Sequence, residues 1–394
     1  MAFVYYAIGK IGKVRKKRKL TVDVEAEMAR DTIFSPAFGN RPSQLVGRES
    51  VMRSLLHGLG QMPGSRERSV VLLGQRGSGK TVLLWELADQ ASERGWVVAS
   101  PTIASEDMPE RIVEKIQDAG EPYVKRNTPK LSGGSVGALG FSAGLQFTRD
   151  VQETKSFAYK LTQLARACTQ SGHGVLILVD ELQANSPEVR QLVTAYQELI
   201  GEGLDVALVM AGLPGAVAAT LNDHVLTFLN RATKTTLQPL AFGDVDAFYQ
   251  MAFESVGVLV SDEQRRTASK ATSGSPYLLQ LIGHNIVARV PQGATLSDAG
   301  LRSALAAARI DYENGVCETT LAALSDVDVS FLRAMAPDEH ESAIADIAAR
   351  MGVSYDYAQK YRKRLIDAGV VESAGRGKIA FAVPLLSDYL RREE

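Results

Sequence analysis

Up to Pro239, the apolar positions fall into short continuous runs separated by longer amphipathic stretches. The runs do not alternate with polar residues, so they predict strands buried on both faces of a parallel sheet. Apolar residues between the runs recur at helical spacing, which predicts helices on both sides of that sheet. The predicted strands are 69–73, 96–99, 175–179, 206–211 and 235–237, and the predicted helices are 49–59, 81–93, 110–118, 151–168 and 187–200. We therefore expect a three-layer α/β domain.

Residues 131–147 interrupt this pattern with a stretch rich in glycine and serine. Its apolar residues are spaced so that a β-hairpin insertion fits, and such a hairpin would serve as a contact for DNA or for a neighbouring subunit. A mobile surface loop fits the same composition. Both interpretations stay open.

After Pro239 the periodicity is helical alone, and near Ser325 it changes again. The predicted helices of the middle part are 243–255, 261–272, 276–290 and 298–321, the last with a break near Gly315. The last part is predicted to contain helices at 327–334, 343–351 and 355–368 and hairpin strands near 370–372 and 379–382. A small all-α domain is therefore expected before a C-terminal domain with the element order of a winged helix-turn-helix.

Composition and charge exclude some classes of protein but do not identify a function. The 394 residues are 45% hydrophobic and 23% charged, with a net charge of −1, which is typical of a globular protein with two or three domains. The two cysteines lack metal-ligand spacing and read as buried apolar residues in a reducing compartment. No stretch reaches the roughly 18 apolar residues of a membrane span, and the N-terminus does not resemble a signal peptide. We expect a cytoplasmic protein.

The run KIGKVRKKRK at residues 10–19 contains seven basic residues and no acidic one. Such a run cannot build a core, so it is expected to be a solvated arm. The arm would either contact nucleic-acid phosphates without sequence preference or remain a disordered tail.

The segment VVLLGQRGSGKTVLLW at residues 70–85 carries the clearest chemistry. An apolar strand leads into a glycine-rich turn, and a lysine and a threonine open the next helix, as in a loop that binds nucleotide phosphates. Glycines let the backbone N–H groups turn toward the phosphates, and the helix N-terminus adds a positive dipole. The predicted nucleotide contacts are Gly74, Gln75, Arg76, Gly77, Ser78, Gly79, Lys80, Thr81 and Val82.

Two acids end the apolar strand at 175–179 and supply the second part of an ATP hydrolase. Asp180 is predicted to hold Mg²⁺ together with the hydroxyl of Thr81. Glu181 is predicted to act as the general base toward the attacking water. Lys80 is predicted to bridge the β- and γ-phosphates. ATP and Mg²⁺ are therefore the expected cofactors, and ATP hydrolysis is the expected reaction.

The phosphate loop, the strand ending in Asp180–Glu181, the helical domain and the winged helix together resemble the AAA+ superfamily. Within it, residues 44–390 are similar to prokaryotic ATPases of the origin-recognition-like and signal-transduction (STAND) types. The resemblance implies that Val46 and Gly47 lie against adenine and that Pro276 opens a helix of a nucleotide-binding lid. It is also compatible with homo-oligomers that form on ATP binding.

Arg231 occupies a position that resembles the arginine finger of AAA+ proteins, which reaches the γ-phosphate bound by a neighbouring subunit. An ordinary exposed arginine is the alternative.

The sequence also departs from the family at two positions near the expected γ-phosphate. The strand at 206–211 is followed by Gly212–Leu213–Pro214 instead of a polar residue, and the helix from Pro276 lacks an arginine in its first turns. Both predict slow hydrolysis.

The third helix of the predicted winged helix is basic and aromatic. Its expected DNA contacts, with two from the wing, are Tyr355, Gln359, Lys360, Arg362, Lys363, Arg364, Arg376 and Lys378. We expect the ATP state to control the binding of this domain to double-stranded DNA. The alternative is a signalling ATPase whose winged helix contacts protein during assembly.

These predictions divide the chain into four parts. They are a basic, partly disordered arm (1–43), a P-loop ATPase core (44–240), a helical lid (241–324) and a winged helix (325–394). No membrane partner is expected.

Overall fold

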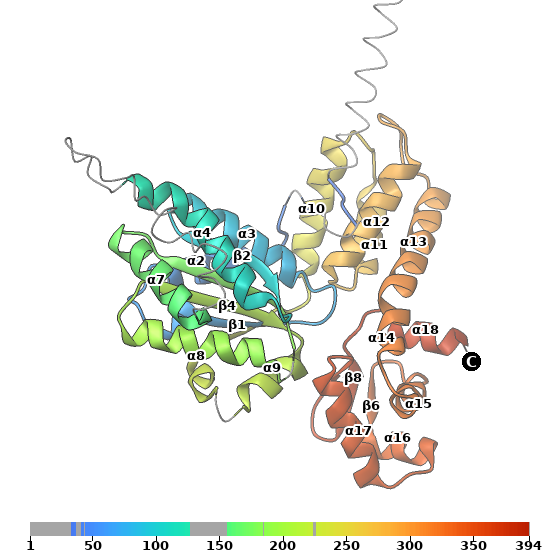
Figure 1. Cartoon of the computed structure of the whole chain (residues 1–394). Helices are drawn as coiled ribbons and strands as arrows, with labels where there is room; N and C mark the ends of the chain where they lie inside the picture. Colours follow the sequence, from blue (N-terminus) through green and yellow to red (C-terminus); the bar gives the residue numbers. More distant parts are fainter. Residues whose placement is uncertain are drawn as a thin grey trace, which may run out of the picture. The chain divides into compact units, whose positions relative to one another are not determined.

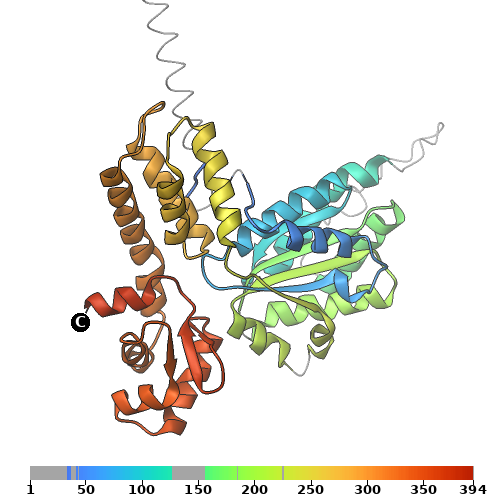
Figure 2. The same cartoon turned by 180° about the vertical axis from the view of Figure 1, so that it is seen from behind.

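The computed structural model describes residues 33–36, 41–42, 44–126, 156–183, 185–223 and 226–393. Its chain forms two compact units, and each joins segments that are distant in sequence (Figures 1 and 2). One unit contains the described residues up to Gly47 together with Pro239–Gly315, and the other contains the described residues between Arg48 and Gln238 and those from Val316 onward. The basic run at 10–19 and the glycine-rich stretch at 131–147 lie outside the described residues.

A five-stranded parallel sheet is the centre of the second unit, as the apolar runs predict. Its strand order is β2-β3-β4-β1-β5, and its neighbouring strands pair in parallel. The strands are β1 (Ser69–Leu73), β2 (Val97–Ile103), β3 (Val175–Leu182), β4 (Val206–Gly212) and β5 (Thr233–Thr236). The edge strand β5 begins two residues before its predicted position, because its short, exposed sequence gives a weak apolar signal.

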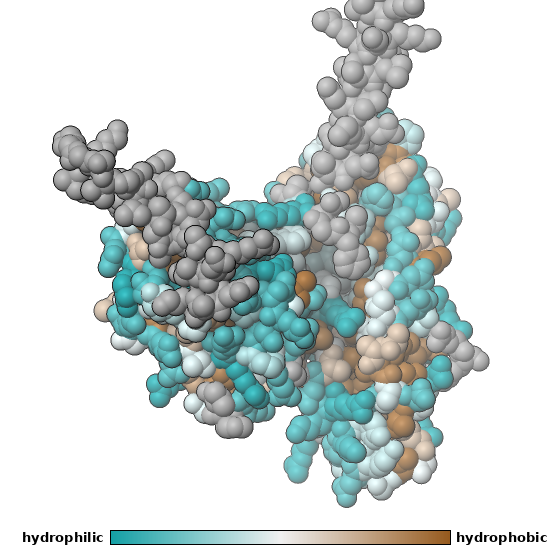
Figure 3. Space-filling model, viewed as in Figure 1, coloured by the Kyte–Doolittle hydropathy of each residue, from teal (hydrophilic) through white to brown (hydrophobic). Residues whose placement is uncertain are grey.

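Helices cover both faces of this sheet, which confirms the three-layer prediction (Figure 1). They are α2 (Glu49–Leu59), α3 (Lys80–Glu93), α4 (Met108–Arg126), α7 (Phe157–Gln170) and α8 (Pro187–Gly201). One core cluster joins alternate strand residues such as Ile177 and Leu208 to helices α4, α7 and α8, and the intervening residues point to the opposite face. The apolar sides of these helices thus pack against the sheet. The surface of this domain drawn in Figure 3 is mostly hydrophilic.

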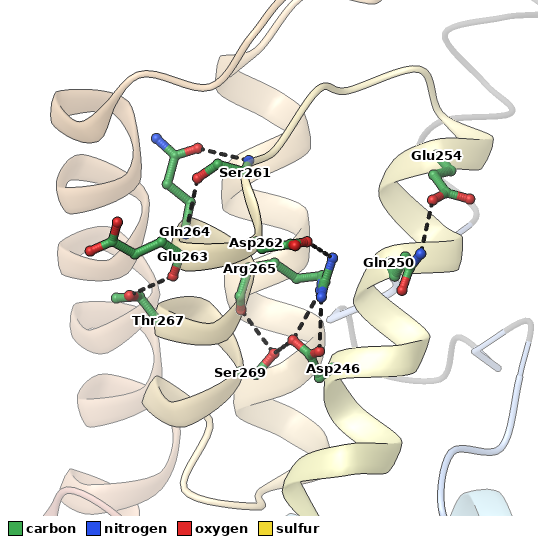
Figure 4. Close-up of polar contacts among 10 residues, drawn as sticks. All are labelled: Asp246, Gln250, Glu254, Ser261, Asp262, Glu263, Gln264, Arg265, Thr267 and Ser269. Carbon is green, nitrogen blue, oxygen red and sulfur yellow. Dashed lines mark hydrogen bonds and ion pairs between the residues drawn. The ribbon is translucent and has the colours of Figure 1, made fainter.

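The helical domain at residues 239–315, which we call the lid, contains four helices. They are α10 (Phe242–Ser255), α11 (Asp262–Ala271), α12 (Pro276–Arg289) and α13 (Asp298–Tyr312). A polar network fastens the first two (Figure 4). The Nε and Nη2 atoms of Arg265 donate to the two carboxylate oxygens of Asp246 at 3.0 and 3.1 Å, and Ser269 Oγ also donates to this carboxylate. The predicted break near Gly315 coincides with one π-helical turn at Glu313–Cys317, followed by α14 (Glu318–Ala322).

The C-terminal segment, residues 316–394, contains the predicted helices and hairpin. Its elements are α15 (Asp326–Met335), β6 (Glu341–Ala343), α16 (Ile344–Met351), α17 (Tyr355–Asp367), β7 (Val371–Ser373), β8 (Lys378–Phe381) and α18 (Leu386–Glu393). Gly352 and Gly369 end α16 and α17 in the left-handed region, with φ angles of 65° and 69°. The three strands form an antiparallel sheet of order β6-β8-β7. Among the described residues, no helix has the length and apolar content to cross a bilayer.

Replacing Arg265 by alanine is expected to lower the free energy of unfolding of the lid by about 2 kcal/mol at neutral pH, because Asp246 loses its charged hydrogen-bond donors. Those hydrogen bonds hold the pKa of Asp246 below its usual 3.8, against the opposing effect of burial. The stabilisation is complete above that usual value and is lost as pH falls through the lowered pKa. Denaturant unfolding at neutral and acidic pH should therefore show Arg265→Ala and wild type converging in acid. Arg302, exposed on α13 of the same domain, provides the control variant, Arg302→Ala.

Candidate functional site

The glycine-rich turn lies between β1 and α3 and has the backbone that its sequence requires. Gly77 and Gly79 adopt φ angles of 73° and 85°, a region that costs glycine little and other residues more. Gly79 is the N-cap of α3, and no side chain caps that helix end. A Cβ atom on Gly74 would overlap with Ser78 Oγ. The loop thus presents free N–H groups and a helix N-terminus, which together favour a bound anion.

Lys80 is a partly buried cation inside this loop. Its Nζ atom donates to the carbonyl oxygens of Gly74 and Gln75, both at 2.8 Å. Burial lowers the pKa of Lys80 from 10.5 to about 8, while the charges of Asp180 and Glu181 oppose the change. Neutral carbonyl groups only partly replace the water that this amine has lost. The charge is therefore well suited to pair with an anion that enters the loop.

Thr81 and Asp180 meet at the end of β3, as the sequence predicts. Thr81 Oγ1 donates to Asp180 Oδ2 at 2.5 Å, and the second carboxylate oxygen accepts from the backbone N–H of Glu181 at 2.9 Å. Asp180 is only 5% exposed. A hydroxyl and a buried carboxylate side by side are oxygen ligands of the kind that Mg²⁺ takes beside nucleotide phosphates. The donor set therefore fits the expected metal ion.

Glu181 and Arg231 are both exposed, in contrast to Asp180. Glu181 has a φ angle of 52°, and it lies where the pairing of β3 with β4 becomes irregular. This turn brings its side chain to the surface at the carboxyl end of the sheet. Arg231 ends the 3-10 turn η2 (Thr227–Arg231) before β5, and no ion pair involves it in the described part of the chain. Each side chain is thus accessible to water or to another molecule.

Arg48 is a site residue that the sequence reasoning did not single out. It is 6% exposed, and its Nη2 atom donates to the carbonyl oxygen of Ser78 in the phosphate loop at 3.3 Å. Burial lowers the pKa of its guanidinium group, and its buried Nε atom has no hydrogen-bond partner among the described residues. Arg48 directly follows Val46 and Gly47, the predicted adenine contacts. Its place beside them in the sequence could have identified it as a site residue.

The remaining predicted nucleotide contacts are divided between the units. Val82 is in the first turn of α3, beside the phosphate loop. Val46, Gly47 and Pro276 belong to the unit that contains the lid, and their contact with a nucleotide stays a prediction. Pro276 is the first residue of α12, where Ser275 Oγ accepts from the N–H of Leu278, so the turn does open a helix as expected.

Ion pairs within the chain occupy part of the basic face that is predicted on α17 and the wing. Arg364 pairs with the fully buried carboxylate of Asp328 at 2.9 Å, and Lys378 pairs with Glu341. The side chains of Arg362 and Gln359 donate to neighbouring hydroxyl groups. The members of the predicted face that are exposed and form no ion pair with another described residue are Tyr355, Lys360, Lys363 and Arg376. This smaller group is the part of the face that is free for an external anion.

Helix α17 lies against α9 (Pro214–Leu221), which follows β4. Gly369, two residues after the end of α17, lies against Gln75 of the phosphate loop. A Cβ atom on Gly215 would overlap with the carbonyl oxygen of Asp367. A Cβ atom on Gly369 would likewise overlap with Gln75 Oε1. Two glycines, one from each partner, thus permit a close approach that joins the predicted DNA-binding helix to the loop.

Comparisons with known proteins agree with this geometry. A family model described as an AAA ATPase domain matches residues 44–210, and one described as a domain of unknown function (DUF8462) matches residues 314–390. No curated protein matches the sequence.

Two solved structures share the fold of most of the chain. The Walker-type ATPase of Pyrococcus abyssi is similar with a TM-score of 0.67 and 16% identity, over 89% of this chain and 97% of that chain. The ORC2 protein of Aeropyrum pernix, solved as ADPNP–ADP complexes, is similar with a TM-score of 0.60 and 16% identity, over 91% and 97%. The predicted resemblance to AAA+ ATPases is thus confirmed as a similarity: residues 44–210 match the AAA ATPase domain model, and the two solved structures share the fold of this chain.

Proposed function

We propose that this protein binds and slowly hydrolyses ATP and that its nucleotide state controls the binding of the C-terminal segment to duplex DNA. The observation that carries the proposal is the contact of Gly369, two residues after α17, with Gln75 of the phosphate loop. The end of this helix is thus near the predicted nucleotide site, while Lys360 and Lys363 remain exposed. A change at the loop therefore has a direct physical route to the DNA-binding face.

The proposed roles at the ATP site follow from the geometry of the side chains. Lys80 leaves the carbonyl groups of Gly74 and Gln75 and neutralises phosphate charge. Thr81 and Asp180 hold Mg²⁺, which when bound neutralises charge on the β- and γ-phosphates. Glu181, exposed at the end of β3, orients the attacking water and accepts its proton.

Slow turnover is proposed because two polar groups are missing. The end of β4 continues as Gly212–Leu213–Pro214, and α12 begins with Pro276–Tyr277–Leu278, so neither offers a charged or amide side chain to the γ-phosphate. Charge that develops in the transition state is then less well stabilised. Arg231 would supply part of that stabilisation from a neighbouring copy of the chain. We expect a basal rate below about 1 per second.

A second candidate function has one specific observation in its favour. The ion pairs of Arg364 with Asp328 and of Lys378 with Glu341 reduce the free positive charge of the predicted DNA-binding face. Such a face suits contacts with protein, in which case ATP would control assembly and duplex DNA would leave turnover unchanged.

Phosphate release with and without duplex DNA tests the proposed function. We expect Lys80→Ala to lose nucleotide binding, Glu181→Gln to retain bound ATP without hydrolysing it, and Arg231→Ala to bind ATP but lose turnover. The exposed glutamate of α8 gives the control variant Glu198→Gln, which should behave as wild type. Stimulation of the wild-type rate by DNA supports the first candidate. Undiminished hydrolysis by Glu181→Gln would contradict its assignment as the base.

The affinity for ADP is expected to depend on pH through Lys80. Below about pH 8 the amine is protonated and the affinity should be constant. Above that value the amine must first take up a proton, so the dissociation constant should rise by about tenfold per pH unit. Lys80→Arg should abolish this slope because arginine stays charged. Isothermal titration calorimetry in buffers with different ionisation enthalpies would detect the proton uptake, and its absence at alkaline pH would refute the expectation.

The contact between α9 and α17 can be tested with two matched glycines. Gly215 and Gly243 are both the second residue of their helices, where alanine favours helix formation by up to about 1 kcal/mol. A Cβ atom meets Asp367 at Gly215 but meets nothing within 4 Å at Gly243. We expect Gly215→Ala to remove the difference in DNA affinity between the ADP state and the state with a non-hydrolysable ATP analogue. Gly243→Ala should keep the difference, and equal behaviour of the two variants would exclude this route.

A further inference from the structure

The short N-terminal piece at residues 33–36 is anchored in the lid by Phe34. The side chain of Phe34 is 1% exposed, and its ring centroid lies 5.8 Å from that of Phe248, 6.0 Å from that of Tyr249 and 5.8 Å from that of Phe253. All three partners belong to α10. Aromatic rings at these distances attract one another beyond the effect of burial alone. Phe34 is therefore part of the lid core, although it is more than 200 positions away in the chain.

Helix α12 completes the socket around Phe34. A Cβ atom on Gly283 would overlap with the Phe34 ring, so a glycine is needed where the ring crosses the helix. The N–H of Ser35 donates to Gln280 Oε1 of the same helix at 2.9 Å. The N-terminal piece is thus held by ring packing against α10 and by a hydrogen bond to α12.

The piece that carries the predicted adenine contacts lies against the same helical domain. Gly47 adopts a φ angle of 63°, and a Cβ atom there would lie 2.9 Å from Asp244 Oδ2 in the first turn of α10. The next residue, Arg48, begins the other unit and donates to Ser78 of the phosphate loop. The peptide between Gly47 and Arg48 therefore separates a segment attached to the lid from one attached to the loop.

We propose that Phe34 is a positioning residue for the adenosine part of the nucleotide. It acts through α10, because Phe34 packs against that helix and Gly47 approaches its first turn closely, so the helix keeps Val46–Gly47 in place before ATP arrives. Ordering a free segment on binding costs conformational entropy, and a segment that is already held does not incur this cost. This inference rests on the proposed function, in which Val46 and Gly47 contact adenine.

The experiment compares two ligands that differ in the adenosine part. ATP and inorganic tripolyphosphate both offer phosphates to the loop, but only ATP offers adenosine. We expect Phe34→Ala to weaken ATP binding by about tenfold and to leave the affinity for tripolyphosphate unchanged. Phe34→Leu, which keeps a large apolar side chain in the socket, should restore most of the ATP affinity. Lys80→Ala, in contrast, should weaken the binding of both ligands.

Gly283 and Gln280 give independent variants. Gly283→Ala should expel the Phe34 ring and reproduce the loss of ATP affinity, and the double variant with Phe34→Ala should be no weaker than either single one. Gln280→Leu removes only the hydrogen bond from Ser35 and should weaken ATP binding by about threefold in a lid that keeps its core. Circular dichroism verifies that each variant is folded.

The outcomes separate this inference from the function on which it rests. Equal losses for ATP and tripolyphosphate in Phe34→Ala and Gln280→Leu would show a general structural role and overturn the proposal, as would unchanged ATP binding in both. A wild-type protein that binds tripolyphosphate as tightly as ATP would also overturn it, because adenosine would then contribute nothing. A wild-type protein that binds neither ligand would refute the proposed function itself, and the inference with it.

Discussion

The partly buried charge of Lys80 is the constraint on which the candidate site depends. Its amine is held by two backbone carbonyl groups, and burial lowers its pKa to about 8. A cation with so little water around it is stable only beside negative charge or oriented dipoles. Asp180 and Glu181 supply part of that charge from the end of β3, whereas an incoming phosphate would supply the rest. The site is thus prepared for an anion before one binds.

On the proposed function, close backbone approaches are the route by which the loop would act on its surroundings. Gly74 leaves room for Ser78 inside the loop, and Gly369 leaves room for the Gln75 side chain on its outer side. Gln75 Oε1 is buried without a hydrogen-bond partner among the described residues, so its contact with Gly369 is one of packing. Packed groups at such distances transmit displacement because they cannot be compressed. The proposed control by nucleotide therefore needs no contact beyond those of Gly369 with the loop and of α17 with α9.

The sequence predicted the elements that have strong local patterns. The apolar runs at β1, β3 and β4, the loop at Gly74–Thr81 and the Thr81–Asp180 pair all follow from periodicity and known spacing. Short elements such as β6 were missed because three residues carry no period. Phe34 was missed because its burial depends on α10 and α12, and nothing near residue 34 indicates those helices. The ion pair of Arg364 with Asp328 was hidden for the same reason, since it joins two helices of a tertiary fold.

The end of β4 affects both the expected γ-phosphate site and the packing of α9 against α17. Leu213–Pro214–Gly215 replaces the polar residue expected near the γ-phosphate, and it also begins α9, where Gly215 admits the Asp367 carbonyl group. On the proposed function, one short sequence thus gives up catalytic stabilisation and gains a contact with the DNA-binding helix. Coupling between two ligands is reciprocal, so DNA that displaces α17 would alter nucleotide affinity by the same factor. Slow hydrolysis then keeps each state long enough for the partner to respond, which is what a switch requires and a motor does not.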